Sequence, residues 1–134
     1  LKIKGLHVSK ENPNPVIYKG EYGKVILSDI RYGREAGVQG YHFTFDIENR
    51  TQTDMAVSLG DAYINNIKIS AYTDITSIEA GRNGTMESNI REQDMTAEME
   101  GFTQIESKIY ISTNVMFGEA YLSIPVIIDR DAVN

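Results

Sequence analysis

A strict alternation of apolar and polar side chains between Tyr41 and Glu48 constrains the fold more than any other part of the chain. Successive side chains on a β-strand point to opposite faces, so the apolar residues share one face and the polar residues the other. The apolar face contains Tyr41, Phe43, Phe45 and Ile47, and the polar face contains His42, Thr44, Asp46 and Glu48. On a helix these rings would spread around the whole circumference. The stretch therefore predicts a half-buried strand with three aromatic rings directed into the core.

Short alternating or apolar stretches recur along the rest of the chain, about one every ten residues. We expect strands within residues 1–8, 16–18, 24–30, 55–59, 61–70, 85–90, 107–115 and 119–128. This spacing, without intervening helices, is typical of an all-β sandwich or barrel. Residues 32–40 contain three glycines and are expected to form a loop, and residues 72–78 an irregular connection. The sequence thus predicts about eight or nine strands.

Two local patterns predict particular turns. Asn65-Asn66 suits a two-residue hairpin turn, because asparagine tolerates the positive φ that such turns require. That turn pairs Ile64 with Ile67 and Ala62 with Ile69, which places all four apolar side chains on one face. The single helical candidate is residues 94–101, where Asp94 can cap the first turn and Gly101 can end the last. Its apolar face would consist of Met95, Met99 and Phe102.

The chain of 134 residues is long enough for one domain with one core. We assign residues 16–134 to that domain and residues 1–15 to an N-terminal edge strand or a linker, because Pro13 and Pro15 interrupt regular structure. Neither a signal-peptide pattern nor a membrane-spanning apolar run is present. The first residue is Leu1 rather than Met, so we expect that an upstream segment was removed.

Charge and cysteine content exclude several kinds of chemistry. The formal net charge is −6 and the lysines and arginines are scattered, which argues against a nucleic-acid partner. The chain has no cysteine, so disulfides, thiol nucleophiles and thiolate metal sites are excluded. The sequence contains no recognisable cofactor-binding motif, and we expect no cofactor.

The histidines and acids give little support for a metal or catalytic site. His42, Asp46 and Glu48 share a predicted strand face, but residues four apart on a strand are separated by about 13 Å. Metal ligands must converge to within about 2–2.5 Å of one ion, so we interpret this face as solvated and expect no tight metal binding. Neither His7 nor His42 lies in a recognisable nucleophile motif. We therefore expect a domain that is not an enzyme, with a small hydrolase as a distant alternative.

A set of short motifs at expected strand ends and turns resembles a known family. The segments "DIEN" (residues 46–49), "INN" (64–66), "EAG" (79–81) and "MEGFTQIESKIYI" (99–111) occur in this order. Their succession is similar to immunoglobulin-like β-sandwich domains of unknown function found in lipoproteins and secreted proteins of Gram-positive bacteria. This chain departs from that family at Asn66, where glycine is usual, and at Phe102, where an aliphatic residue is commoner. The resemblance implies an immunoglobulin-like, two-sheet antiparallel sandwich in an extracytoplasmic location. It implies no catalytic residues.

Two sets of residues are candidates for contact with a partner. Tyr63, Tyr72 and Tyr110 are expected to face outward, either as a glycan-binding platform or simply as cover for the sheet surface. Met116 and Phe117 lie at the expected tip of the last hairpin, where polar residues are usual. They either fold back to close the end of the sandwich or protrude into a partner. Of these residues, we select Met116, Phe117 and Tyr63 as the partner-binding candidates.

These observations lead to one functional expectation and one alternative. We expect a non-catalytic, extracytoplasmic, immunoglobulin-like domain of a bacterial surface protein or lipoprotein, secreted or anchored through an upstream lipid. Its role would be protein–protein contact or structural spacing, with an unknown protein or cell-wall component as partner. The alternative is a glycan-binding module of the bacterial cell surface.

Overall fold

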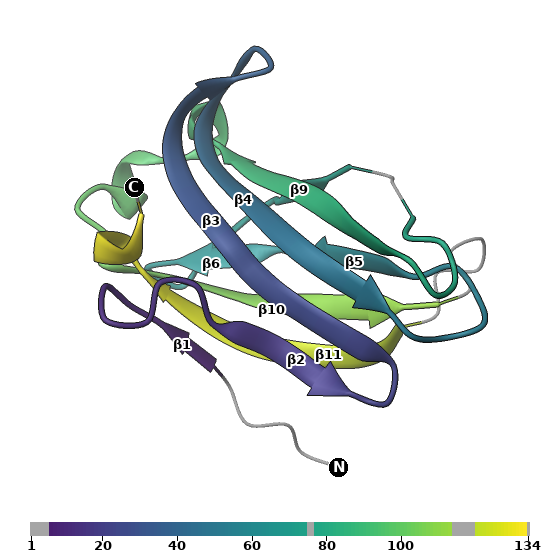
Figure 1. Cartoon of the computed structure of the whole chain (residues 1–134). Helices are drawn as coiled ribbons and strands as arrows, with labels where there is room; N and C mark the ends of the chain where they lie inside the picture. Colours follow the sequence, from purple (N-terminus) through teal and green to yellow (C-terminus); the bar gives the residue numbers. More distant parts are fainter. Residues whose placement is uncertain (1–5, 75–76, 114–119, 134) are drawn as a thin grey trace.

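Two β-sheets pack face to face in the computed structural model, which describes residues 6–74, 77–113 and 120–133 (Figure 1). Within these residues the only helical segments are single 3-10 turns. The strands are β1 (Leu6–Val8), β2 (Val16–Gly20), β3 (Gly23–Glu35), β4 (Val38–Asn49), β5 (Ala56–Leu59), β6 (Ala62–Ile64), β7 (Ile67–Ile69), β8 (Tyr72–Thr73), β9 (Asn83–Arg91), β10 (Gln104–Ser112) and β11 (Ala120–Asp129). The predicted all-β, two-sheet sandwich is confirmed, with more strands than the eight or nine expected.

The topology places the longest strands in one sheet. That sheet has the order β2-β3-β4-β9-β8, and the other has the order β1-β11-β10-β6-β7, with β5 also pairing with β10. All pairings between the named strands are antiparallel except one: β1 runs parallel to β11, with Leu6 opposite Val126 and Val8 opposite Ile128. The expected edge strand at the N-terminus is therefore present over Leu6–Val8, and Val8 is fully buried.

The inner face of β4 lies at the centre of the core. Phe43 and Phe45 are both 0% exposed, and Tyr41 and Ile47 are also buried. On the outer face Asp46 is exposed, and Thr44 and Glu48 are partly buried. The predicted division of the strand into two faces is thus confirmed for every residue but one.

His42 is that exception, since it is only 5% exposed although a solvated position was expected. Its Nε2 lies 3.1 Å from the carbonyl oxygen of Gly33 and 3.0 Å from that of Val38. Both partners are acceptors, so Nε2 carries the proton that is shared between them. The expectation failed because these backbone groups at the end of the β3–β4 hairpin surround the imidazole.

The β3–β4 hairpin is much longer than predicted, because residues 32–35 and 38–40, expected to be loop, are strand. β3 continues to Glu35, and the chain reverses at Ala36 and Gly37, which have φ values of 50° and 80°. These positive φ values define a tight two-residue turn of the kind that matches the strand twist. Gly40 lies inside β4. The residue there must be glycine, because a Cβ would come 2.1 Å from the carbonyl oxygen of Ile90 on β9. This glycine therefore marks close backbone approach, not a loop.

A β-bulge lets β3 and β4 curve across the other sheet (Figure 1). The register shifts between Leu27 and Asp29, which leaves Ser28 without an opposite residue on β4. Bulges of this kind bend a strand and increase its twist. Asn14, in the loop after β1, donates to the carbonyl oxygen of Ser28 at 2.6 Å and so attaches the N-terminal segment to the bulge. The hairpin tip extends past the end of β9, because the pairing of β4 with β9 stops at Gly40, opposite Arg91.

The β6–β7 hairpin has the predicted register. Ala62 is opposite Ile69, Tyr63 opposite Lys68 and Ile64 opposite Ile67. Asn65 and Asn66 have φ values of 53° and 67°, as the predicted turn requires. The side chain of Asn65 also donates to the carbonyl oxygen of Glu98 at 3.0 Å. The two asparagines therefore have different roles, since only the first makes a hydrogen bond outside the turn in the described structure.

The first prediction concerns the core. Phe43→Ala or Phe45→Ala is expected to reduce the free energy of unfolding by about 3–5 kcal/mol, because each removes a fully buried ring and leaves a cavity. Asp46→Ala, on the exposed face of the same strand, should change it by about 0.5 kcal/mol or less. Thr44→Ala should fall between them at about 1 kcal/mol, because its hydroxyl takes part in two hydrogen bonds. Urea denaturation of the four variants measures these values, and a different ranking would contradict the assigned faces.

The second prediction concerns the β6–β7 turn. Asn66→Gly is expected to leave stability unchanged or to raise it by less than about 1 kcal/mol, because glycine is preferred at the second position of this turn. Asn65→Gly should instead lower stability by about 1 kcal/mol, because it removes the hydrogen bond to Glu98. Thermal melting of both variants checks the difference, and equal effects would show that this bond contributes nothing.

Candidate functional site

A pocket opens at the end of the sandwich where the β3–β4 hairpin extends over the β9–β10 connection. Three parts of the chain line it: the hairpin, the connection and the short turn after β11. Its principal side chains are those of Tyr32, Tyr41, Met95, Met99, Phe102 and Arg130. We call this the end pocket. Its surface is divided about equally between apolar and polar groups, and Glu92, Glu100 and Arg130 are its charged residues.

Aromatic rings form one wall of the end pocket. Tyr32 and Tyr41 are opposite each other on β3 and β4, and their ring centroids lie 4.9 Å apart. The ring of Phe102 meets that of Tyr41 edge-on, with centroids 5.6 Å apart. Tyr41 and Phe102 are buried, whereas Tyr32 is 43% exposed. The wall therefore has a fixed, buried base and one ring available to a ligand.

Charged groups surround this wall. The guanidinium of Arg130 lies 4.6 Å from the centroid of the Phe102 ring and donates to the Phe102 carbonyl oxygen. The hydroxyl of Tyr32 hydrogen-bonds to the carboxylate of Glu92. Burial raises the pKa of the Tyr41 phenol, although nearby Arg130 opposes that shift, so this phenol is neutral at physiological pH. The pocket thus has an ionic rim around a neutral aromatic surface.

The segment predicted as a helix over residues 94–101 forms two 3-10 turns instead. They are η1 (Glu92–Asp94) and η2 (Ala97–Met99), and residues 95 and 96 between them are extended. Asp94 is not a cap, and the N-cap of η2 is Thr96. A helix of two turns has little stability of its own, so packing determines the conformation here. The expected apolar trio nevertheless meets, since Met95, Met99 and Phe102 all line the end pocket.

A second hollow contains the predicted partner residue Tyr63. This ring is 44% exposed on β6, and it shares the hollow with Tyr110, Asp61, Glu106 and Lys108. Tyr110 lies against Gly60, where a Cβ would come 2.4 Å from its ring. Tyr72, the third tyrosine expected to face outward, is on β8 in the other sheet, where it is opposite Asn89 of β9. We call the depression around Tyr63 and Tyr110 the tyrosine hollow.

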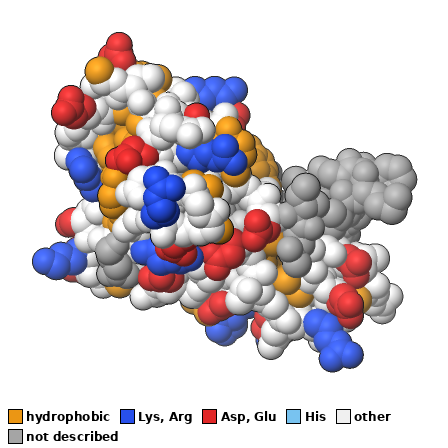
Figure 2. Space-filling view, turned by 90° about the horizontal axis from the view of Figure 1, so that it is seen from above, with side chains coloured by type: hydrophobic (Ala, Val, Ile, Leu, Met, Phe, Trp, Pro, Cys, Tyr) orange, Lys and Arg blue, Asp and Glu red, His pale blue; other side chains and the backbone are white. Residues whose placement is uncertain are grey.

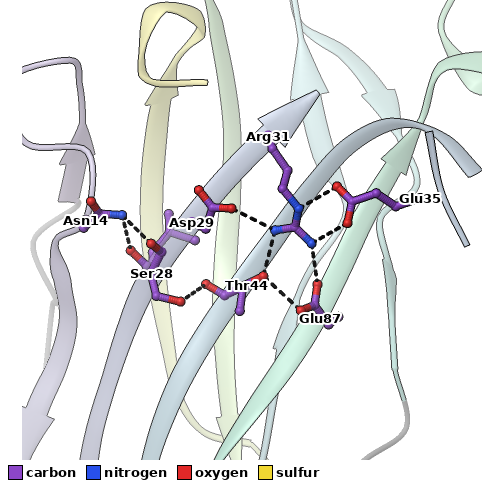
Figure 3. A network of polar contacts seen from close by, with 8 residues as sticks. Asn14, Ser28, Asp29, Arg31, Glu35, Thr44 and Glu87 are labelled. Atoms are coloured by element: carbon purple, nitrogen blue, oxygen red, sulfur yellow. Dashed lines mark hydrogen bonds and ion pairs between the residues drawn. The ribbon is translucent and has the colours of Figure 1, made fainter. Parts of the chain in front are cut away.

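A polar network on the outer face of the long-stranded sheet is centred on Arg31 (Figure 3). Its guanidinium binds Glu35 through two hydrogen bonds of 2.5 and 2.7 Å, and it also donates to Asp29, Thr44 and Glu87. The Thr44 hydroxyl donates in turn to Glu87 at 2.9 Å. With its donors engaged in this way, Arg31 fastens β3, β4 and β9 together. We interpret the network as structural.

The histidines and acids do not converge on a catalytic or metal centre within the described residues. His7 bonds to Asp129 at 2.7 Å and His42 to two backbone carbonyls, so neither contacts a serine or threonine hydroxyl there. In that same part of the chain, no group of three histidine or acidic side chains is close enough to hold a metal ion. The predicted contact residues Met116 and Phe117 lie outside the described residues.

The fold and the end pocket define an all-β sandwich with a preformed hollow at one end. The sequence matches no protein-family model, and it is similar to none of the curated proteins. In the described structure, no helix has the length and apolar character needed to span a membrane. Basic and acidic side chains are interspersed on the face seen in Figure 2, and the described residues form no continuous basic surface on that face.

Sequence reasoning missed Tyr32 and Arg130 as site residues. The signal for Tyr32 was present but depended on the Ala36-Gly37 turn, which places Tyr32 opposite Tyr41. A loop over residues 32–40, as the glycines suggest, does not bring Tyr32 and Tyr41 together. For Arg130 the sequence carries no such signal, since its position depends on how the chain turns after β11.

The third prediction concerns the Arg31 network. Hydrogen bonding to Arg31 lowers the pKa of Glu35 below its usual value of 4.5. Because the pKa of Glu35 is lower in the folded chain than in the unfolded chain, its carboxylate stabilises the fold at any pH above the unfolded-state pKa of about 4.5. This contribution is lost as the pH falls from about 4.5 through the lower pKa of the folded state. Arg31→Gln should therefore return the pKa of Glu35 toward 4.5 in a carboxylate NMR titration. The pKa of Glu98, which is lowered by its own backbone N–H and by Thr96, should not change. An unchanged Glu35 pKa in the variant would contradict the assignment.

Proposed function

We propose that this chain is a non-catalytic, extracytoplasmic, immunoglobulin-like domain of a bacterial surface protein or lipoprotein that binds a protein partner through the end pocket. The resemblance of four short sequence motifs to immunoglobulin-like domains of Gram-positive bacteria supports the assignment to that family and to an extracytoplasmic location. The end pocket supports the binding role, because a hollow with an aromatic wall is already formed in the unbound chain. Binding at a preformed site costs little ordering of the protein.

The composition of the end pocket favours a protein segment carrying a large apolar side chain. Met95 and Val133 are partly exposed there, and Met99 and Phe102 form the buried base. Methionine is flexible and polarizable, so it adapts to differently shaped apolar groups and is common at binding surfaces. The exposed ring of Tyr32 can cover an inserted side chain, and tyrosine is enriched among residues that dominate binding energy. An apolar anchor in this pocket, with polar contacts at its rim, is the arrangement typical of protein recognition.

Glycan binding is the second candidate, and the tyrosine hollow is the observation that favours it. Tyr63 offers an exposed ring beside Tyr110, and Asp61, Glu106 and Lys108 supply acceptors and a donor around them. A sugar requires this combination of an apolar ring face and several hydrogen-bonding groups. The two candidates use different surfaces, so a single pair of variants separates them.

The fourth prediction uses Tyr32 and Tyr63, which are equally exposed tyrosines in the two hollows. Short random peptides displayed on phage would be selected against the purified domain, and the domain would also be applied to a glycan array. We expect enriched peptides with apolar anchors whose affinity falls about tenfold or more in Tyr32→Ala, because truncating a central aromatic contact costs over about 1.4 kcal/mol. Tyr63→Ala should bind these peptides normally, and both variants should melt within a few degrees of the wild type.

The opposite pattern supports the glycan candidate. The glycan-array signal would then disappear in Tyr63→Ala and persist in Tyr32→Ala, and no peptide would be enriched. That result would show that the tyrosine hollow, and not the end pocket, is the binding site. A domain that enriches no peptide and binds no glycan would refute both candidates and leave only the spacer role.

A further inference from the structure

The exposed ring of Tyr32 has a carboxylate at its edge. Its hydroxyl donates to the carboxylate of Glu92, which links β3 to η1 beside the end pocket. Both residues line the pocket and both are exposed to solvent. A carboxylate accepts several hydrogen bonds through its two oxygens, so the bond from Tyr32 leaves most of that capacity for another donor. We call these two residues the Tyr32–Glu92 pair.

Neither member of this pair is engaged by a cation within the described structure. Glu92 takes part in none of the ion pairs between described residues. In that part of the chain, the two arginines that stack on aromatic rings lie over Tyr72 and Phe102, and not over Tyr32. The exposed part of the Tyr32 ring and the carboxylate of Glu92 are therefore available to a cation from outside.

The charges of the end pocket are separated along its aromatic wall. The ring contacts run from Phe102 to Tyr41 and from Tyr41 to Tyr32. The guanidinium of Arg130 lies over Phe102 at one end of this row, 4.6 Å from the ring centroid. Glu92 lies against Tyr32 at the other end. The wall thus has a positive end and a negative end, and the exposed ring is at the negative end.

The connection that carries Glu92 adds to the negative charge there. Residues 92–100 contain four acidic side chains and no basic one. The closest basic residues along the chain do not line the end pocket, since Arg91 stacks on Tyr72 of β8 and Arg34 donates to a carbonyl oxygen at the hairpin tip. A ligand that is basic at this end of the pocket is therefore complementary to it in charge.

An aromatic ring beside a carboxylate is a combination that recognises a cation. The ring quadrupole attracts a cation that lies over the ring face, and the carboxylate accepts charge-assisted hydrogen bonds from it. A guanidinium can make both contacts at once, because it is planar and carries its donors around its edge. It is also more weakly hydrated than an ammonium group, so it loses less on leaving water. The Tyr32–Glu92 pair therefore favours arginine over lysine.

We propose that the Tyr32–Glu92 pair binds an arginine side chain of the protein segment whose apolar side chain occupies the end pocket. The partner segment then has a basic residue next to its apolar anchor. This inference rests on the proposed function, and it adds the charge of the partner. The guanidinium of the partner stacks on the exposed ring of Tyr32 and donates to Glu92, at the end of the aromatic wall away from Arg130.

The fifth prediction compares two blocked dipeptides, acetyl-Phe-Arg-amide and acetyl-Phe-citrulline-amide, by NMR titration of the whole domain at physiological ionic strength. Citrulline has nearly the shape of arginine but carries no charge. We expect the arginine peptide to bind about fivefold more tightly, because it alone makes a cation–π contact and a charge-assisted hydrogen bond. It should also shift the ring-proton signals of Tyr32 and the side-chain carboxyl signal of Glu92.

Charge-removing variants test where the preference arises. In Glu92→Gln the preference should fall below about twofold, and because Glu92 is exposed the variant should remain folded. The amide keeps an oxygen for the Tyr32 hydroxyl, so the variant removes only the charge. The matched control is Glu98→Gln, which removes the same charge from the same connection at a residue that does not line the pocket. The full preference should remain there. Equal loss in Glu98→Gln would show a long-range charge effect and overturn the proposal.

The failure of this inference is distinguishable from failure of the proposed function. If both peptides bind equally and Tyr32→Ala abolishes both, the end pocket remains a peptide site and the assignment of a basic residue is wrong. If neither peptide binds, the proposed function is wrong and the basic residue falls with it. Titration with methylguanidinium separates a protein segment from a free cation. Binding of methylguanidinium as tight as that of the arginine peptide would mean a small-cation site and would overturn the proposed segment.

Discussion

Burial of the aromatic face of β4 determines the arrangement of the sandwich. Phe43 and Phe45 need apolar neighbours on every side, and the adjacent strands and the opposite sheet supply them. Because β4 lies in the middle of its sheet, β3 and β9 must pair along both of its edges. The bulge at Ser28 bends β3 together with β4, so that both strands curve over the core. The Arg31 network lies on the outer face of these strands.

The end pocket follows from the same pairing. β4 is longer than the core requires, and at Gly40 its backbone lies so close to β9 that no side chain fits between them. Beyond that point β9 turns away into η1, and β3 and β4 continue as a two-stranded hairpin. Tyr32 and Tyr41 lie where the two strands leave the body of the sandwich. Packing is completed there by Met99 and Phe102 from the β9–β10 connection, and the remaining space is the end pocket.

Sequence reasoning succeeded where a local pattern has only one physical solution. The alternation over Tyr41–Glu48 and the Asn65-Asn66 turn each fix a face or a register without reference to distant residues. It failed where tertiary contacts decide. The glycines of residues 32–40 serve a tight turn and a close backbone approach, which composition alone does not distinguish from a loop. The short segment after Asp94 has helical periodicity but too few residues to form a helix unaided. His42 is buried by two carbonyl groups of the β3–β4 hairpin, in a region where the sequence predicts a loop. The end pocket was therefore not predictable, because its side chains come from three segments that meet only in the folded chain.

The parallel pairing of β1 with β11 has a mechanical consequence. Three register pairs join the strands, and the His7–Asp129 contact adds a side-chain link beside them. Tension that enters before β1 and leaves after β11 pulls the two strands past each other along their common axis. The backbone hydrogen bonds between them lie across that axis, so they resist the load together instead of opening one after another. The sandwich is thus arranged to carry longitudinal tension across the seam between β1 and β11.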